Sequence, residues 1–243
     1  MKVLIPTAKG MSTKSNSTLM KELSSKSKSI LKELLKLSNK DLEKLYKIKD
    51  HQAEKEKARW EKIADKTAQG YAALNLFDGL MYRNIKRESL SKEEQEYFAQ
   101  NVFITSSFYG IINVFEYISE HRLDFLQNIK VEGKSLKQTW KSDYDSFVEN
   151  EELVISLLSS EFEEVFSKKA REKFVKIIFL EEKEGVRKTH STISKKARGK
   201  FLSYLVEKQI TDIEELKKIE FENYKLEKEL STEKELVFVA QLG

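Results

Sequence analysis

The sequence contains no cysteine, one proline and three histidines, and each scarcity excludes a class of site. Without cysteine the chain can form neither a disulfide nor a thiolate metal site, and it cannot use a cysteine nucleophile, which fits a reducing compartment. The histidines His51, His121 and His190 are far apart and lack metal-ligand spacing. We therefore expect no metal and no cofactor.

Long apolar runs and catalytic signature motifs are also missing. The N-terminal run Met1–Pro6 is too short for a signal peptide or a membrane span, so we expect a cytoplasmic protein with no membrane partner. The sequence has no Walker loop, no G-x-G-x-x-G and no G-x-S-x-G. Its many acidic residues form no recognisable catalytic pair, so no motif identifies a reaction.

The composition that remains is that of a globular domain. Of 243 residues, 40% are hydrophobic and 35% are charged, and a chain of this size buries a substantial core without disulfides. There is no internal repeat and no linker rich in glycine or proline. Strand-like and helical segments alternate early and a hairpin comes late, which predicts an α/β protein with a mixed sheet and flanking helices. We expect one domain over residues 1–243.

Hydrophobic periodicity predicts the individual elements. Buried strands are expected at 2–6, 102–105 and 153–157, and later strands at 221–226 and 236–240. Helices are expected at 30–37, 51–67, 136–149 and from Lys195 to about Gln209, with a further one through Ala72 and Leu76. A hairpin of 174–180 and 186–193 should turn at Glu184-Gly185. Asn39 should cap a helix, Ser91 to Glu94 resembles a capping box, and the Ser- and Lys-rich stretch 13–29 is expected to be mobile.

Three loops of small polar residues follow predicted strands. They are Thr7–Gly10, Ser106–Gly110 and Ser159–Glu161. In open α/β sheets, ligands collect beyond the carboxyl ends of the strands, so these loops are candidates for a site. The alternative is that they are ordinary polar connections.

The charge is unevenly distributed along the chain. Residues 1–21 and 185–206 contain no acidic residue and hold ten of the 44 bases, so the rest of the chain has 34 bases against 40 acids. If the two acid-free segments lie side by side, they form a positive field that attracts a polyanion. The alternative is two unrelated solvated stretches.

The segment Lys195–Gly199 lies at the start of a predicted helix capped by Ser194. Lys195, Lys196 and Arg198 then fall in the first turn, where cations are unfavourable because a helix N-terminus carries partial positive charge. This placement predicts a bound anion, held by free N–H groups and by the side chains. On a helical wheel Arg198 falls on the buried side, so its side chain should point inward. Gly199 has no side chain and permits another part of the molecule to approach the helix backbone closely. The alternative is a solvated helix start with Arg198 paired to a carboxylate.

Seven short segments stand in the same order as the motifs of one known family. They are Val3–Lys9, Phe77–Tyr82, Ile104–Gly110, His121–Asp124, Leu157–Phe162, Lys195–Gly199 and Glu235–Phe238. They resemble the I-S-P-A-K, F-x-G-D-V-Y, L-S-G-L-Y-G, Y-R-L-E, L-A-S-N-E-Y, K-K-A-R-G and E-L-V-F of the YaaA-type peroxide-stress proteins. The resemblance extends over essentially the whole chain.

The resemblance implies a single mixed α/β domain with a positively charged cleft, the cantaloupe-type fold, and a helix-hairpin-helix-like element. It implies binding of duplex or locally opened DNA, or of a phosphate-bearing ligand, and protection against hydrogen peroxide by limiting free iron. Carried over by motif, the candidate cleft residues are Lys9, Gly79, Tyr82, Tyr109, Gly110, Arg122, Ser159, Glu161, Lys195, Lys196 and Arg198.

The sequence also departs from the family motifs. Leu80 replaces an aspartate, Asn84 replaces a glycine, and Asn113–Glu116 replaces R-P-L-D. These departures fit a protein that binds without catalysis or prefers a different ligand. Three functions remain open: a DNA-binding protein of the peroxide response, an enzyme acting on a nucleotide or on a base in DNA, and an iron-handling protein. For the enzyme, Glu161 would act as acid or base, Lys9 and Arg122 would hold phosphate, and Tyr109 would stack on a base.

Overall fold

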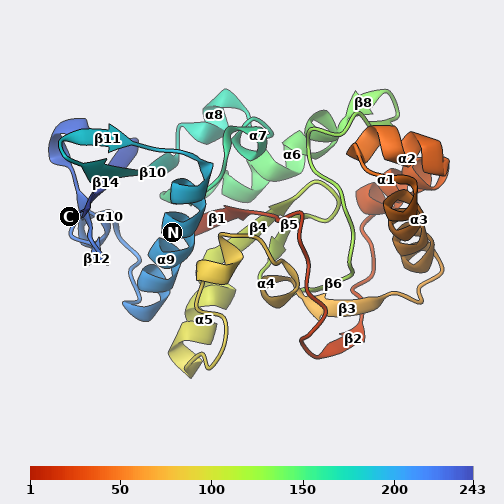
Figure 1. The fold of residues 1–243 in the computed structure, drawn as a ribbon, viewed down its shortest axis with the longest axis horizontal. Coiled ribbons are helices and arrows are strands. Elements are labelled where there is room, and N and C mark those ends of the chain that lie inside the picture. Colours follow the sequence, from red (N-terminus) through yellow and green to blue (C-terminus); the bar gives the residue numbers. More distant parts are fainter. Residues whose placement is uncertain (243) are drawn as a thin grey trace.

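A mixed sheet of nine strands lies at the centre of the molecule (Figure 1). Its strands are β1 (Lys2–Pro6), β4 (Val102–Ser106), β5 (Gly110–Asn113), β9 (Val154–Ser156), β10 (Phe174–Lys183), β11 (Val186–Lys188), β12 (Glu220–Phe221), β13 (Tyr224–Leu226) and β14 (Glu235–Leu242). Eight of them follow the order β12-β13-β14-β10-β9-β1-β4-β5, and β11 pairs with β10. The structure is a computed structural model that describes residues 1–242, so Gly243 of the predicted domain lies outside the described part. The predicted α/β class and mixed sheet are confirmed.

Ten α-helices and two small sheets complete the described residues. The helices are α1 (Ser25–Leu35), α2 (Asn39–Tyr46), α3 (Asp50–Ala64), α4 (Ala73–Leu76), α5 (Lys92–Asn101), α6 (Leu136–Val148), α7 (Ser160–Glu163), α8 (Lys168–Arg171), α9 (Ser191–Glu207) and α10 (Ile213–Leu216). The small sheets contain β2 (Ser17–Leu19), β3 (Gln69–Ala72) and β6 (Tyr117–Ile118), and β7 (Lys130–Val131) with β8 (Lys134–Ser135). The 3-10 helices are η1 (Tyr82–Asn84) and η2 (Lys228–Leu230).

The five neighbouring strands β14, β10, β9, β1 and β4 run parallel, and helices cover both of their faces. In β1, Val3 and Ile5 pack on one face with side chains of α5 and α9, while Leu4 packs on the other with α6. All three side chains are fully buried, which explains why the strand reads as a continuous apolar run. Because the strands are parallel, the carboxyl ends of β1, β4 and β9 lie at the same edge of the sheet.

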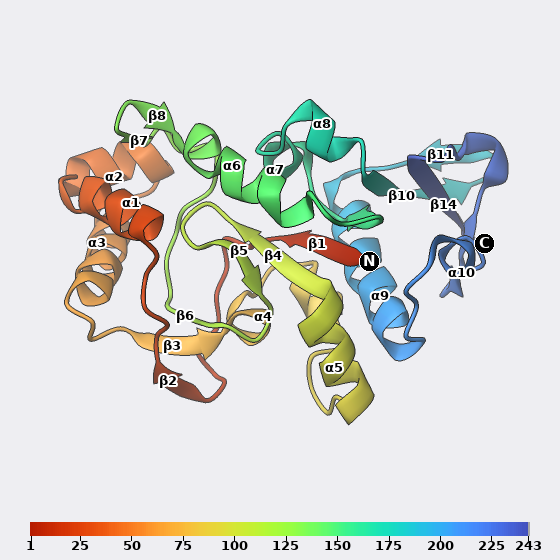
Figure 2. The same ribbon diagram turned by 180° about the vertical axis from the view of Figure 1, so that it is seen from behind.

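The N-terminal helices α1, α2 and α3 lie at the opposite end of the molecule from the C-terminal strands (Figures 1 and 2). The side chains of Trp60 and Ile63 on α3 are buried. The stretch 13–29, expected to be mobile, contains β2 and the start of α1, where the Ser27 hydroxyl donates to the Phe108 carbonyl at 2.8 Å.

The observed ends of helices α2, α4 and α5 can be compared with the predicted ones. The N-cap of α2 is Ser38 and not Asn39, because the Ser38 hydroxyl accepts the Asp41 N–H and Asp41 completes a capping box. The helix predicted through Ala72 and Leu76 is the single turn α4, because Ala72 still belongs to β3. The capping box at Ser91 is confirmed.

The late hairpin and the helix after it differ from the prediction in one important respect. The turn at Glu184-Gly185 is confirmed, and both residues have positive φ. Helix α9, however, begins at Ser191 with His190 as its N-cap, four residues before the predicted start. Lys195, Lys196 and Arg198 therefore lie beyond the first turn, and the predicted conflict with the helix dipole was wrong. The reason is that Ile193 is buried one helical turn before Ala197, so it extends the apolar face of the helix.

Within residues 1–242, no helix is both long enough and apolar enough to cross a membrane.

Candidate functional site

A cavity of about 410 Å³ opens at the carboxyl ends of β1 and β9. Its walls come from five segments: Pro6–Met11, Phe77–Tyr82, His121–Asp124, Ser159–Phe162 and the first two turns of α9. The two acid-free segments of the sequence therefore meet at one cavity, Lys9 coming from the first and Lys195 and Arg198 from the second. Eight of the eleven candidate residues line it: Lys9, Gly79, Tyr82, Arg122, Ser159, Glu161, Lys195 and Arg198.

Two of the three predicted strand-end loops contribute to the cavity. The loops after β1 and β9 line it, whereas Ser106–Gly110 does not. The reason is that β4 turns directly back into the antiparallel β5, and the Ser106 hydroxyl accepts the N–H groups of Phe108 and Tyr109 inside the turn. The residues of this loop therefore form the turn between β4 and β5.

Close backbone packing between two loops shapes one wall. The Asp78 N–H donates to the Gly10 carbonyl at 2.8 Å, and a Cβ atom on Gly79 would come within 2.8 Å of the Ala8 Cβ. The Tyr82 hydroxyl donates to the Pro6 carbonyl at 2.8 Å while its ring is buried. Gly79 and Tyr82 thus hold the loop after β1 in place, in addition to lining the cavity.

Two carboxyl groups and one lysine form one end of the cavity. Lys9 Nζ lies 3.4 Å from Asp124 Oδ2, and Glu161 Oε1 accepts the Phe125 N–H at 3.1 Å. Burial raises the pKa of the Glu161 carboxyl, and the neighbouring charge of Asp124 raises it further. Asp124 was absent from the candidate residues, although it belongs to the same four-residue motif as Arg122.

Two cations of helix α9 that line the cavity, Lys195 and Arg198, lack carboxylate partners in the described residues. Within residues 1–242, neither Lys195 nor Arg198 has an acidic oxygen within 4 Å, and the buried Nε of Arg198 makes no hydrogen bond. Burial lowers the pKa of the half-buried Arg198 guanidinium, while the charge of Glu163 acts in the opposite direction. A desolvated cation without a partner is poised to bind an anion.

The Arg122 side chain is held by Tyr46, the last residue of α2. One Nη donates to the Tyr46 carbonyl at 3.3 Å, and the guanidinium lies 5.3 Å from the centre of the Tyr46 ring. Its Nε is buried without a hydrogen-bond partner in the described residues. The side chain therefore connects α2 to the cavity and keeps part of its donor capacity.

His121 lines the cavity although it was not among the candidates. The residue is 2% exposed, and its Nδ1 lies 2.8 Å from the Ser119 carbonyl, which assigns the hydrogen to Nδ1. Burial lowers its pKa to about 4, so the ring is neutral at pH 7 and Nε2 is an acceptor. No hydrogen bond to Nε2 forms within residues 1–242. The available signal was the motif that also contains Arg122 and Asp124.

Three candidate residues lie outside the cavity lining. The Tyr109 ring packs against Phe108 and His121, with centroids 4.6 and 5.0 Å apart, and its hydroxyl accepts the Ser119 N–H. A Cβ on Gly110 would meet the Trp140 ring at 2.7 Å. Lys196 is exposed. The ring of Tyr109 is thus engaged in packing and is not open for stacking on a base in this cavity.

In the described part of the chain, no three Asp, Glu or His side chains are grouped so as to hold a metal ion. The chemistry that the cavity offers is that of cations, carboxyl groups and one neutral imidazole.

Known proteins similar to this chain agree on one family. The family model described as "Peroxide stress protein YaaA" matches residues 1–230. A UPF0246 protein of Streptococcus gordonii is 49% identical over 242 residues, covering 100% of this chain and 99% of that protein. UPF0246 proteins of Streptococcus thermophilus and Streptococcus pneumoniae are 49% and 46% identical over 240 and 242 residues, covering 98% and 100% of this chain and 97% and 100% of their own lengths.

Proposed function

Because this chain belongs to the family of the peroxide stress protein YaaA, we propose that it binds DNA in the response to hydrogen peroxide and limits iron-dependent damage. The observation that carries the DNA-binding part is the cavity, where the cations Lys195 and Arg198 have no carboxylate partner in the described residues. Arg198 is partly buried and Lys195 is exposed, and both can bind phosphate oxygens through charge-assisted hydrogen bonds. The limitation of iron-dependent damage follows from the resemblance to the family.

The start of α9 adds a second source of positive potential. Ser191 and Thr192 line the cavity, and the N–H groups of residues 191–193 come before Ser194, whose N–H is the first to donate within the helix, to the His190 carbonyl. Such N–H groups, together with the helix dipole, favour a phosphate. Lys195 and Arg198 follow within the next turn, so backbone and side-chain donors reach the same space.

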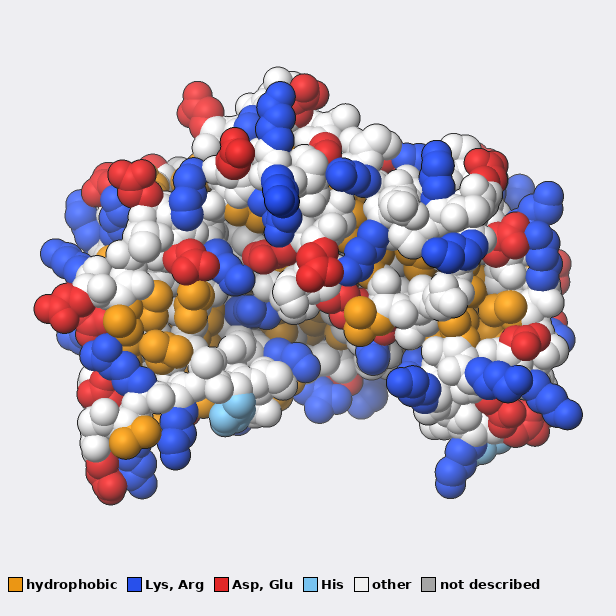
Figure 3. All heavy atoms as spheres, turned by 90° about the horizontal axis from the view of Figure 1, so that it is seen from above, with side chains coloured by type: hydrophobic (Ala, Val, Ile, Leu, Met, Phe, Trp, Pro, Cys, Tyr) orange, Lys and Arg blue, Asp and Glu red, His pale blue; other side chains and the backbone are white. Residues whose placement is uncertain are grey.

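The charge on the molecular surface fits a ligand that is larger than the cavity. Figure 3 shows a broad hollow between two projecting ends of the molecule, which carry many Lys and Arg side chains together with some Asp and Glu. We assign the β10–β11 hairpin and α9 as the element that follows the DNA backbone, in the place of the helix-hairpin-helix-like element of the family. A positively charged cleft in a cantaloupe-type fold is part of this proposal.

A second candidate function rests on the carboxyl groups. Glu161 is partly buried next to Asp124, and its raised pKa is a frequent property of acid-base catalysts. An enzyme acting on a base in DNA would have to take that base out of the stack. Turnover of bubble substrates with oxidised bases would identify it, and absence of product across a broad panel would exclude it.

The DNA-binding proposal is tested by a salt titration of affinity. The wild-type protein should lose affinity linearly in the logarithm of salt concentration, because phosphate contacts release counterions. The double variant Lys195→Ala/Arg198→Ala should bind about a hundredfold more weakly to all sequences and show a slope shallower by about 2. Binding of the double variant with wild-type affinity and slope would contradict the proposal.

A further inference from the structure

The cavity is not built for a phosphate alone. Much of its wall is apolar, and includes Ala8, Met11, Phe77, Leu80, Leu123 and Phe162. A phosphate group needs N–H and O–H donors and gains nothing from apolar surface. Small-molecule sites, in contrast, combine apolar walls with a few polar groups that fix orientation, and their volumes begin at about 300 Å³. The wall therefore indicates a ligand with a hydrophobic face as well as an anion.

The charged groups of the cavity are divided between two ends. The charges that act on Glu161 are those of Asp124, Lys9 and Lys137, and none comes from α9. The charge that acts on Arg198 is that of Glu163. The cations of α9 and the carboxyl groups therefore come from different walls of one cavity, and one ligand can place different groups at each.

Two residues at the carboxyl end offer acceptors, Glu161 and His121, while Lys9 pairs with Asp124 and Arg122 donates to the Tyr46 carbonyl. Glu161 Oε1 accepts the Phe125 N–H, which leaves Oε2 free, and His121 offers Nε2 because its Nδ1 hydrogen faces the Ser119 carbonyl. His121 is 98% buried, since it is 2% exposed, and it lines the same cavity. An ionised carboxylate accepts hydrogen bonds only. This end is suited to a heterocycle that presents N–H donors.

We propose that the cavity holds a single nucleotide, with its phosphate at Lys195 and Arg198 of α9 and an amino-bearing base at Glu161 and His121. The inference rests on the proposed binding of phosphate at α9 and adds recognition of the base. The same nucleoside monophosphate unit can arrive free in solution or as an unstacked nucleotide of DNA. An exocyclic amino group donates to Glu161, whereas a base with a carbonyl at that position offers a second acceptor and is disfavoured.

The test compares ligands that differ in one group, with the unchanged protein. Affinities of cytidine, uridine, guanosine and inosine monophosphates and of inorganic phosphate are measured by calorimetry at pH 8, because a higher pH favours the ionised carboxyl. Cytidine and guanosine monophosphates should bind about tenfold more tightly than their uridine and inosine counterparts, and phosphate alone more weakly than any of them. Equal affinities across the nucleotides would overturn the inference.

Two matched variants locate the recognition. Glu161→Gln replaces the acceptor with an amide that both donates and accepts. The ratio of affinities between the amino-bearing nucleotide and its counterpart should therefore fall to about one. Glu164→Gln makes the same change at an exposed residue just after α7 that pairs with Lys137, and it should keep the preference. An unchanged preference in Glu161→Gln, with a normal melting curve, would remove Glu161 from the site.

DNA hairpins separate the two sources and the two proposals. A hairpin with one bulged cytosine should bind more tightly than one with a bulged thymine if the nucleotide comes from DNA; equal binding, with free nucleotides still discriminated, assigns the site to the free nucleotide. Fully paired DNA that binds while no nucleotide is discriminated contradicts the base site and retains the DNA-binding proposal. Discrimination of nucleotides without any binding of DNA contradicts the DNA-binding proposal and retains the base site.

Discussion

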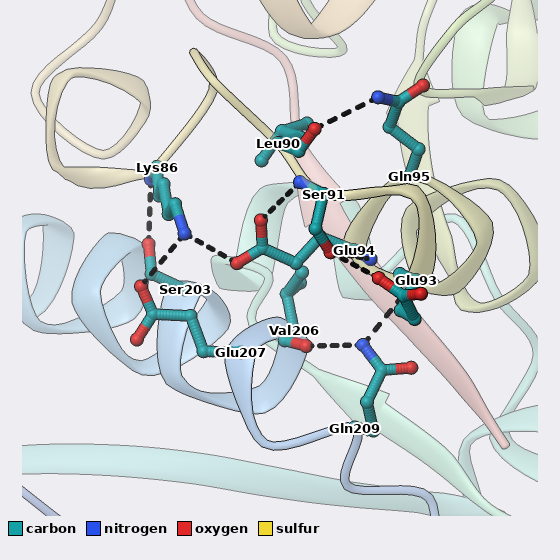
Figure 4. A network of polar contacts seen from close by, with 10 residues as sticks. All are labelled: Lys86, Leu90, Ser91, Glu93, Glu94, Gln95, Ser203, Val206, Glu207 and Gln209. Carbon is teal, nitrogen blue, oxygen red and sulfur yellow. Dashed lines mark hydrogen bonds and ion pairs between the residues drawn. The ribbon is translucent and has the colours of Figure 1, made fainter.

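The two halves of helix α9 differ in whether their charged side chains have partners of opposite charge. In its second half, Ser203 and Glu207 belong to a network in which each charge has a partner (Figure 4). Lys86 Nζ lies 2.6 Å from Glu94 and 3.6 Å from Glu207, and the Ser203 hydroxyl accepts the Lys86 N–H at 2.8 Å. In its first half, Lys195 and Arg198 face the cavity without an acidic partner in the described residues.

We interpret the paired side chains as stabilising the fold and the unpaired ones at the cavity as binding a ligand. In the network, Glu94 also accepts the Ser91 N–H at 2.8 Å and so joins the start of α5 to α9. Paired groups of this kind fix the geometry of neighbouring elements. Groups left unpaired in a partly buried site lower stability, and proteins keep them where a function requires it. The following predictions test whether this division is real.

The largest expected effect concerns His121 on the cavity side. Its folded pKa is about 4 against 6.5 for an exposed histidine, because the ring is buried. The unfolded chain therefore binds this proton at a higher pH than the folded chain. The contribution is fully present above pH 6.5, and about 3 kcal/mol is lost as pH falls to 4.

Thermal unfolding of the wild type and of His121→Phe between pH 7 and 4 measures this loss. The phenylalanine keeps the aromatic packing and cannot titrate, so its unfolding free energy should fall less steeply over that range. Parallel curves for the two proteins would show that His121 is not a buried neutral imidazole.

The next effect concerns Gly199, which lies at the junction of the two halves. A Cβ at this position would come 2.3 Å from the Met81 carbonyl oxygen, so α9 would have to move away from η1. Gly199→Ala should cost about 2 kcal/mol of unfolding free energy, despite the better helix propensity of alanine. Chemical denaturation measures it, with Lys196→Ala as a control on the same helix. A variant as stable as the wild type would mean that the contact is not close-packed.

The smallest effects come from one substitution in each half. Arg198→Met removes an unpaired cation and keeps the volume, so DNA affinity should fall about tenfold while the melting temperature stays the same or rises. Glu94→Gln breaks the network, so the melting temperature should fall by about 2 °C with DNA affinity unchanged. Loss of both properties in both variants would erase the distinction between the halves.

Sequence patterns identified those parts of the fold that depend on local signals. The apolar runs at β1, β4 and β9 predicted buried strands because parallel strands covered by helices are apolar on both faces. The start of α9 was misplaced because Thr192 and Ile193 favour strands locally, whereas burial of Ile193 with Ala197 decides for helix. Tertiary packing overrode local propensity there.

The candidate site was predictable only as far as its motifs. The motif loops supplied Lys9, Arg122 and Glu161, and the structure brings them to one cavity. The motif carried over Lys195 and Lys196 alike, and the structure shows that of the two only Lys195 lines the cavity. It also could not show that Ser106–Gly110 closes a hairpin, because its composition matches that of the two loops that reach the cavity.

These two neighbouring lysines provide the most direct test of the central claim. Lys195 and Lys196 are adjacent, exposed and equal in charge, and only Lys195 lines the cavity. DNA affinity at one fixed salt concentration should fall about tenfold in Lys195→Ala and less than twofold in Lys196→Ala. Equal losses in the two variants would contradict the account, because they would mean that DNA responds to the general charge of α9 and not to the cavity.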